Sequence, residues 1–252
     1  MREPVPYARP ALYARNAAAM WASMAPWSRV APGAPPGLSI IQIPAQPLTR
    51  VILQQAFTAD PGHLGPLLAG DTERGRVVVE DSFGELNMPH ADGVTVLRMP
   101  VMVKAAGPLP ALATRPGIRV VEATAPDTLV QAEQVIVDGF PQPALRPFRP
   151  GRSIPPLVLA TVGWRIWLAY NGGEPAAACC TFDDGSAVGV YWVATLPAHR
   201  SLGLGRAVMT AALNASAHRP AALVATKAGE PLYASLGFRA VSTAAWYWRH
   251  TS

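Results

Sequence analysis

The chain has 252 residues, of which 50% are apolar and 15% charged, a balance that allows one large or two small folded domains and argues against a disordered chain. Its net charge of +5 is spread evenly, with ten basic and eight acidic residues in 1–117 and eleven and eight in 118–252. No basic stripe marks a nucleic-acid face, so we expect no nucleic-acid partner.

Targeting and cysteine signals are both weak. The start has no apolar leader and no run of about 18 apolar residues follows, so we expect a cytoplasmic protein without a membrane partner. Its two cysteines, Cys179 and Cys180, are adjacent within an apolar run. Vicinal cysteines rarely pair and this spacing fits no zinc site, so we expect buried thiols and no metal.

Residues 1–116 are expected to form an N-terminal α/β unit. Helix-spaced apolar residues predict a helix over 7–25, after which prolines break the chain. The later patterns predict strands over 38–43, 76–80 and 94–103, a short helix over 62–69 and a proline-containing linker over 107–116. No chemical motif is found in this part of the chain.

Turn signals separate the elements more clearly in 117–252. A strand over 118–122 precedes a helix that begins near Pro126 and ends at Gly139, and a proline-rich loop follows. The remaining pattern predicts strands over 164–170, 176–182 and 187–195, a helix over 203–218, a strand over 221–226, a short helix over 231–236 and a closing strand or hairpin over 238–248. This order is typical of an α+β fold with a mixed sheet.

The segment 200–206, RSLGLGR, is the one that suggests chemistry, because it follows a strand and opens a helix. Glycine at positions 203 and 205 lets the backbone approach a ligand closely. The first N–H groups of a helix lack partners within it, and the helix dipole favours an anion there. Residues 201–206 are therefore a candidate pyrophosphate cradle, to which Arg200 or Arg206 could add charge.

Three other interpretations of this glycine pattern differ in strength. A dinucleotide fingerprint needs glycine or alanine where Val208 stands, and the preceding strands form hairpins rather than a βαβ unit. A phosphate-binding loop of the Walker type needs a lysine that the segment lacks. A plain helix start without any ligand stays open on the hexapeptide alone.

The wider context adds a family resemblance. Residues 193–209, VATLPAHRSLGLGRAVM, followed by 232–238, LYASLGF, closely resemble the GNAT acetyltransferase family, and the order of elements over 117–252 matches as well. The resemblance implies a mixed-sheet acyl-CoA N-acyltransferase fold and acetyl-CoA as co-substrate. It also implies direct transfer of the acetyl group to an amine, without a nucleophilic serine or cysteine.

The resemblance implies a role for individual residues. Backbone N–H groups near Val193 and Thr195 would bind the pantetheine arm and polarise the thioester, and Tyr233 would protonate the leaving thiolate. The cofactor-binding set is Val193, Thr195, Arg200, Ser201, Leu202, Gly203, Leu204, Gly205 and Arg206. Each of these residues also has an ordinary structural interpretation, such as a core aromatic for Tyr233 or a solvated loop charge for Arg200.

The chain departs from the family pattern in three ways. No asparagine precedes Leu232, Ser201 stands where glycine is usual, and no general base is evident. Asp138, Glu174, Asp183 and Asp184 are candidate bases only because this part of the chain has few carboxylates. His199 is more readily a surface histidine than a ligand. Three loop arginines, Arg146, Arg149 and Arg152, could bind an anionic acceptor or a phosphate of CoA, or could simply be solvated.

These observations predict two domains, 1–116 and 117–252. The first is either a degenerate half-copy of the second or a module for dimerisation or partner binding, and a homodimer stays open. The leading hypothesis is an N-acetyltransferase acting on a primary amine of a small molecule, amino acid or peptide. The alternative is a non-catalytic acyl-CoA sensor or a pseudoenzyme that binds a partner.

Overall fold

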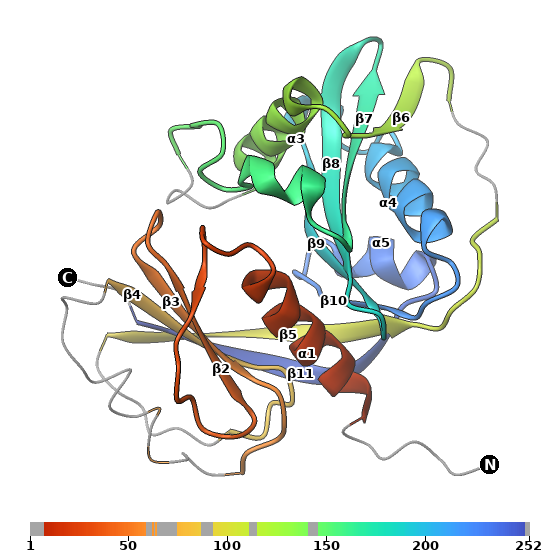
Figure 1. Cartoon of the computed structure of the whole chain (residues 1–252). Helices are drawn as coiled ribbons and strands as arrows, with labels where there is room; N and C mark the ends of the chain where they lie inside the picture. The colour runs from red at the N-terminus through yellow and green to blue at the C-terminus, as the bar shows by residue number, and fades with distance from the viewer. Residues whose placement is uncertain are drawn as a thin grey trace. The chain divides into compact units, whose positions relative to one another are not determined.

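The computed structural model describes residues 8–58, 62, 64, 75–86, 93–110, 115–140 and 146–249 (Figure 1). The chain forms two compact units, and both are discontinuous in sequence. The first unit comprises Met1–Val103, Ala222–Glu230 and Arg239–Ser252, and the second comprises Lys104–Ala221 and Pro231–Phe238. The units therefore interleave along the chain, whereas the predicted division at residue 116 separates consecutive segments.

The first unit is a twisted sheet with one described helix. Its strands follow the order β1-β2-β3-β4-β11-β5-β10. Strands β3 and β4 pair in parallel, whereas the pairs β1–β2, β2–β3, β4–β11 and β11–β5 are antiparallel. The elements are α1 (Ala8–Ala22), β1 (Arg29–Val30), β2 (Leu38–Ile43), β3 (Leu48–Leu53), β4 (Arg76–Asp81), β5 (Val94–Lys104), β10 (Ala221–Val224) and β11 (Arg239–Arg249). The helix predicted over 7–25 and the strands predicted over 38–43, 76–80 and 94–103 are confirmed. Strand β3 was not predicted, and the helix predicted over 62–69 falls largely outside the described residues.

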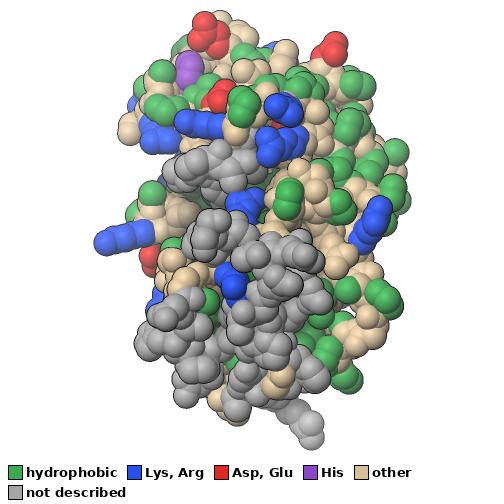
Figure 2. All heavy atoms as spheres, turned by 90° about the vertical axis from the view of Figure 1, so that its left-hand side faces the viewer, with side chains coloured by type: hydrophobic (Ala, Val, Ile, Leu, Met, Phe, Trp, Pro, Cys, Tyr) green, Lys and Arg blue, Asp and Glu red, His purple; other side chains and the backbone are tan. Residues whose placement is uncertain are grey.

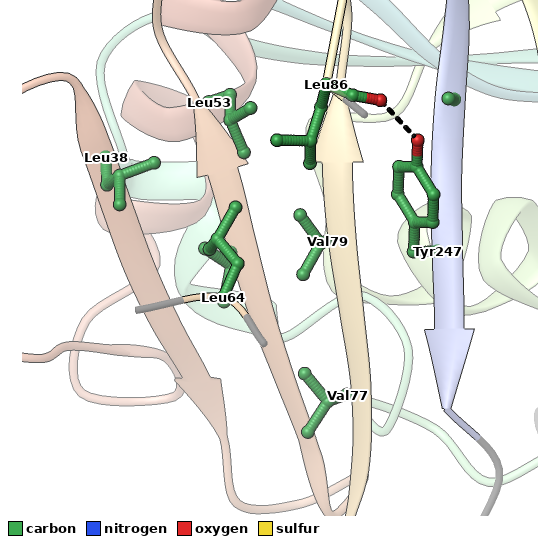
Figure 3. Close-up of a cluster of buried hydrophobic side chains, with 9 residues drawn as sticks. Leu38, Leu53, Leu64, Val77, Val79, Leu86 and Tyr247 are labelled. Carbon is green, nitrogen blue, oxygen red and sulfur yellow. Dashed lines mark hydrogen bonds between the residues drawn. The ribbon is translucent and has the colours of Figure 1, made fainter. Parts of the chain in front are cut away.

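One face of this sheet carries a hydrophobic core. Side chains alternate between the faces of a strand, so Val51 and Leu53 of β3 point to the same side as Val77 and Val79 of β4. Figure 3 shows Leu53, Val77 and Val79 gathered with Tyr247 of β11. The hydroxyl of Tyr247 donates a 2.8 Å hydrogen bond to the carbonyl of Leu86. The hydrogen bond satisfies the one polar atom of that ring.

The alternate residues of the same strands include a buried charge pair. Arg50 of β3 pairs with Glu80 of β4, and only 1% of the Glu80 side chain is exposed. The Arg50 guanidinium lies 4.5 Å from the ring centroid of Trp21 in α1 and 5.9 Å from that of Trp248. Burial raises the pKa of Glu80, and the neighbouring Arg50 only partly offsets this effect.

This shift predicts the sign of a pH effect on stability. A buried acid with a raised folded-state pKa favours folding when protonated, so its ionisation lowers stability as pH rises through the window between about 4.3 and the folded pKa. Glu80→Gln removes this ionisable group and, with it, the loss of stability that its ionisation causes. We expect the stability of the variant relative to wild type, from urea unfolding between pH 5 and 8, to increase with pH by up to about 1.4 kcal/mol per unit. A flat or falling difference would contradict the assignment.

The second unit is an antiparallel sheet flanked by helices. Its strands follow the order β6-β7-β8-β9, and Figure 1 shows α3 and α4 on opposite sides of β7 and β8. The elements are β6 (Ile118–Glu122), α3 (Pro126–Gly139), η3 (Pro156–Ala160), β7 (Trp164–Asn171), β8 (Glu174–Asp183), β9 (Val188–Thr195), η4 (Pro197–His199), α4 (Leu204–Ala215) and α5 (Glu230–Ser235). The predicted strand and helix order of 117–252 is confirmed, and the fold is a mixed α+β fold.

Individual signals of this unit are also confirmed. Helix α3 starts at Pro126, and the hairpin of β7 and β8 turns at Gly172 and Gly173, both at positive φ. Cys179 and Cys180 are fully buried free thiols, as expected. No helix in the described part of the chain is long and apolar enough to cross a membrane.

Candidate functional site

A β-bulge interrupts the pairing of β8 with β9. Cys180 pairs with Tyr191, but Ala178 pairs with Ala194, so two residues of β9, Trp192 and Val193, oppose the single residue Cys179. Trp192 takes the left-handed conformation with a φ of 50°. A bulge leaves the backbone groups of its extra residue outside the ladder. The bulge lies at Val193, one of the two positions near which the family resemblance implies backbone donors, and that role stays a prediction.

Strand β9 ends in a tight turn that opens α4. Ser201 has a φ of 63° and Gly203, the residue before the helix, has a φ of 89°. The first helical bond runs from Ala207 N to Gly203 O at 2.9 Å, and no side chain caps the helix. The N–H groups of the first turn of α4 are therefore left without partners within the helix.

The backbone in front of this helix end is open at Gly203. A Cβ added to Gly203 would meet no described atom within 4 Å, so the backbone there is open to a ligand. Unpaired N–H groups and the positive end of the helix dipole both favour an anion at such a point. The residues predicted as a cradle, 201–206, thus lie at an uncapped helix start with an open backbone, and their binding of a pyrophosphate stays a prediction.

The positive φ angles of Ser201 and Gly203 predict opposite effects of two substitutions on stability. Ser201 adopts a left-handed conformation that disfavours a side chain, so Ser201→Gly should stabilise the protein by about 0.5 kcal/mol, net of the flexibility glycine adds to the unfolded chain. Gly203→Ala introduces the same strain without a clash and should destabilise it by about 1 kcal/mol. Urea unfolding measures both, and effects of equal sign would contradict this conformation.

Arg200 ties the end of β9 to the end of α3. Its Nε donates to the carbonyl of Thr195 at 3.2 Å, and its Nη2 donates to the carbonyl of Gly139 at 3.3 Å. The close approach depends on glycine, because a Cβ at position 139 would lie 3.1 Å from the Cβ of Ala194. Arg200 is thus a structural tie, and its predicted contribution to phosphate binding stays a prediction.

Gly205 and Arg206 join α4 to α5. A Cβ on Gly205 would lie 3.4 Å from both Thr195 Oγ1 and Leu232 Cδ2, so glycine lets strand, helix and α5 meet closely. Arg206 Nη2 donates to Ser235 Oγ at 2.5 Å. The predicted cradle residues are therefore also the packing residues of this corner of the unit.

Tyr233 lies on α5 with 8% of its surface exposed. Its ring meets that of Phe238 edge to face at 6.1 Å, and its hydroxyl makes no hydrogen bond with the described residues. Burial, with a smaller contribution from Cys179, raises the pKa of Tyr233 well above the ordinary value for tyrosine. The phenol therefore stays protonated at neutral pH and is free to donate a hydrogen bond to a ligand.

Most of the other polar candidates serve the local structure. His199 Nδ1 lies 3.2 Å from Asn171 Nδ2, and His199 Nε2 lies 3.9 Å from Glu174, so this histidine supports the β7–β8 hairpin. Asp183 and Asp184 accept backbone hydrogen bonds within the β8–β9 turn, at 2.8 to 2.9 Å. These contacts give no sign of a general base among them.

Glu133 is a polar residue that the sequence reasoning missed. It lies on α3 with 1% of its surface exposed and accepts three backbone hydrogen bonds, from Gly151 and Ser153 at 2.7 Å and from Ile154 at 3.0 Å. A glutamate among the apolar residues of the buried helix face was the available signal. This carboxylate fixes the loop after α3 onto the helix.

Removal of this anchor should be costly. Glu133→Ala leaves three backbone donors without their charged acceptor, and hydrogen bonds to a charged group are each worth about 1.5–3 kcal/mol, so we expect a loss of at least about 3 kcal/mol. Gln134→Ala, at an exposed position of the same helix, is the control and should change stability by less than about 0.5 kcal/mol. Equal effects in thermal or urea unfolding would show that Glu133 anchors nothing.

Comparison with known proteins agrees with this geometry. Residues 163–240, which span the bulge, the turn, α4 and Tyr233, match the model of the acetyltransferase (GNAT) domain. No curated protein matches the chain. The chain therefore carries a GNAT acetyltransferase domain in its C-terminal half.

Solved structures extend the likeness to most of the chain. A GCN5-related N-acetyltransferase from Kribbella flavida aligns with a TM-score of 0.65 and 19% identity over 96% of both chains. A tandem GNAT protein from the clavulanic acid biosynthesis pathway aligns with a TM-score of 0.58 and 15% identity over 88% of this chain and 83% of that one. A GCN5-related N-acetyltransferase-like protein from Streptococcus suis aligns with a TM-score of 0.57 and 11% identity over 95% of this chain and 99% of that one. At these identities the likeness concerns the fold.

Proposed function

We propose that the chain is an acetyl-CoA-dependent N-acetyltransferase that transfers the acetyl group directly to a primary amine of a small molecule, amino acid or peptide. The observation that carries the proposal is one continuous segment, β9 to α4. Within it a β-bulge sets Trp192 and Val193 against the single residue Cys179, and an uncapped helix start follows at an open Gly203. Together they suit a thioester linked to a pyrophosphate.

Binding would use the backbone of this segment. Acetyl-CoA supplies a thioester with an electrophilic carbonyl carbon and a thiolate leaving group. The N–H groups of 201–206 bind the pyrophosphate, and those near Val193 and Thr195 hold the pantetheine arm and the thioester carbonyl. Preorganised donors of this kind are worth about 3–4 kcal/mol of barrier in other acyl-transfer enzymes.

Tyr233 acts on the leaving sulfur. Its raised pKa keeps the proton on the phenol, so the group can donate to negative charge as it develops on sulfur. The same shift widens the gap to the ordinary pKa of a thiol, about 8.5, so full proton transfer is less favourable than unperturbed values suggest. Tyr233 thus stabilises the departing thiolate chiefly through a hydrogen bond.

The acceptor amine must lose a proton before or as it attacks. Three of the candidate carboxylates are not assigned to this task, because Asp183 and Asp184 hold a turn and Glu174 is largely exposed beside His199. A water chain to solvent, or an amine that is already partly deprotonated, serves the same purpose. The rate should then rise with pH as the acceptor amine loses its proton.

Tyr233→Phe tests the catalytic role. We expect kcat to fall by about 10² to 10³, the usual cost of removing one hydrogen-bond donor to developing negative charge, while acetyl-CoA affinity stays within about threefold. The measurement is thiol release and acetyl-amine formation over a panel of primary amines, with Tyr191→Phe, at a buried tyrosine of β9, as the control. A wild type that binds acetyl-CoA but acetylates no amine would favour the non-catalytic sensor instead.

A further inference from the structure

Two arginines bind the last carbonyls of α3. Arg146 Nη2 donates to the carbonyl of Asp138 at 2.9 Å, and Arg200 Nη2 donates to that of Gly139 at 3.3 Å. The two acceptors belong to consecutive residues, so both guanidinium groups lie at the C-terminal end of α3. One comes from the loop after α3 and the other from the turn after β9, 54 residues apart in sequence.

Within the described part of the chain, no carboxylate balances the charge at this point. Neither arginine has a carboxylate within ion-pair distance among the described residues, and the same holds for the exposed Arg149 of the same loop. The C-terminal end of a helix carries about half a negative charge, too little to offset two guanidinium groups. Asp138, the nearest acid in sequence, pairs with neither of them.

Figure 2 shows the surrounding surface. Lys and Arg side chains gather on the side of the second unit that carries α3 and the loop after it. The described end of this loop is held in place, because Glu133 accepts the backbone N–H groups of Gly151, Ser153 and Ile154. A loop fixed in this way presents its charges without a large loss of entropy when a ligand binds.

This pair also lies beside the proposed reaction site. Arg200 donates to the carbonyl of Thr195 through Nε, and Thr195 is two residues beyond Val193 of the bulge. A group held by the two arginines would therefore lie near the end of β9. That position suits the part of an acceptor remote from its reacting amine.

We infer that Arg146 and Arg200 form an anion subsite, and that the acceptor is a primary amine bearing a carboxylate or phosphate group. The inference rests on the proposed function. Arginine suits both anions because its planar fork can bind two oxygens at once. The same chemistry could be offered by a phosphate of CoA, and the two sources differ in which kinetic constant the arginine controls.

The test compares matched acceptors. Phosphoethanolamine is assayed against ethanolamine, and β-alanine against propylamine, with wild type, Arg146→Gln, Arg146→Lys and the charge-matched control Arg239→Gln on an exposed part of β11. We expect wild type to prefer the anionic member of each pair at least tenfold in kcat/KM. Arg146→Gln should lose about tenfold of that preference through KM, Arg146→Lys should recover part of it, and Arg239→Gln should keep it.

Three outcomes would overturn the inference. The first is equal use of charged and neutral amines by wild type. The second is an unchanged preference in Arg146→Gln. The third is a raised KM for acetyl-CoA in Arg146→Gln. If this rise disappears when acetyl-dephospho-CoA is the donor, or if it occurs without any change in the KM of the acceptor, the pair binds the cofactor and not the acceptor.

A turnover-independent measurement separates this inference from the proposed function. Inorganic phosphate is titrated into wild type and Arg146→Gln and followed by amide chemical shifts of the Thr195–Arg200 segment. Weaker phosphate binding in the variant supports the anion subsite even if no acetyl transfer is found, in which case the proposed function alone fails. Identical binding, or none, argues against the subsite.

Discussion

The backbone between β9 and α4 is the constraint on which the second unit depends. It turns from a strand into an uncapped helix, and it does so through left-handed residues at Trp192, Ser201 and Gly203. Two of these are not glycine, and each such residue costs about 1 kcal/mol or more. Stacking of Trp192 on Trp164 at 6.1 Å and the two backbone bonds of Arg200 hold the segment in this form.

The neighbouring contacts serve this segment in turn. Gly139 brings the end of α3 against Ala194, and Gly205 brings α4 against Thr195 and α5, so three elements converge on the end of one strand. Glu133 then fixes the loop after α3 to the same helix. Strain concentrated at one point and supported from several sides is typical of a functional site, and here it coincides with the GNAT domain match at 163–240.

Much of this corner could be predicted from local sequence, because turns and helix starts depend on adjacent residues. The segment 200–206, the Asn171-Gly172 hairpin and Pro126 at the start of α3 all carry such signals. The bulge could not be predicted, since it depends on the register between β8 and β9, and the three partners of Glu133 lie 18 to 21 residues away. The same limit explains the interleaved units: β11 pairs with β4 and β5, far earlier in the chain. That residues 1–116 are a degenerate half-copy stays a prediction.

The most direct test of the central claim is acetyl-CoA binding by calorimetry, with wild type, Gly203→Glu and Gly185→Glu. Both glycines have a φ of 89° and open space at the Cβ position, so the two substitutions carry similar backbone strain and the same added charge. Only Gly203 stands at the start of α4, whereas Gly185 lies in the β8–β9 turn. We expect micromolar binding by wild type and Gly185→Glu and none by Gly203→Glu. Equal binding by all three proteins, or by none, would contradict the assignment of 201–206 as the pyrophosphate cradle.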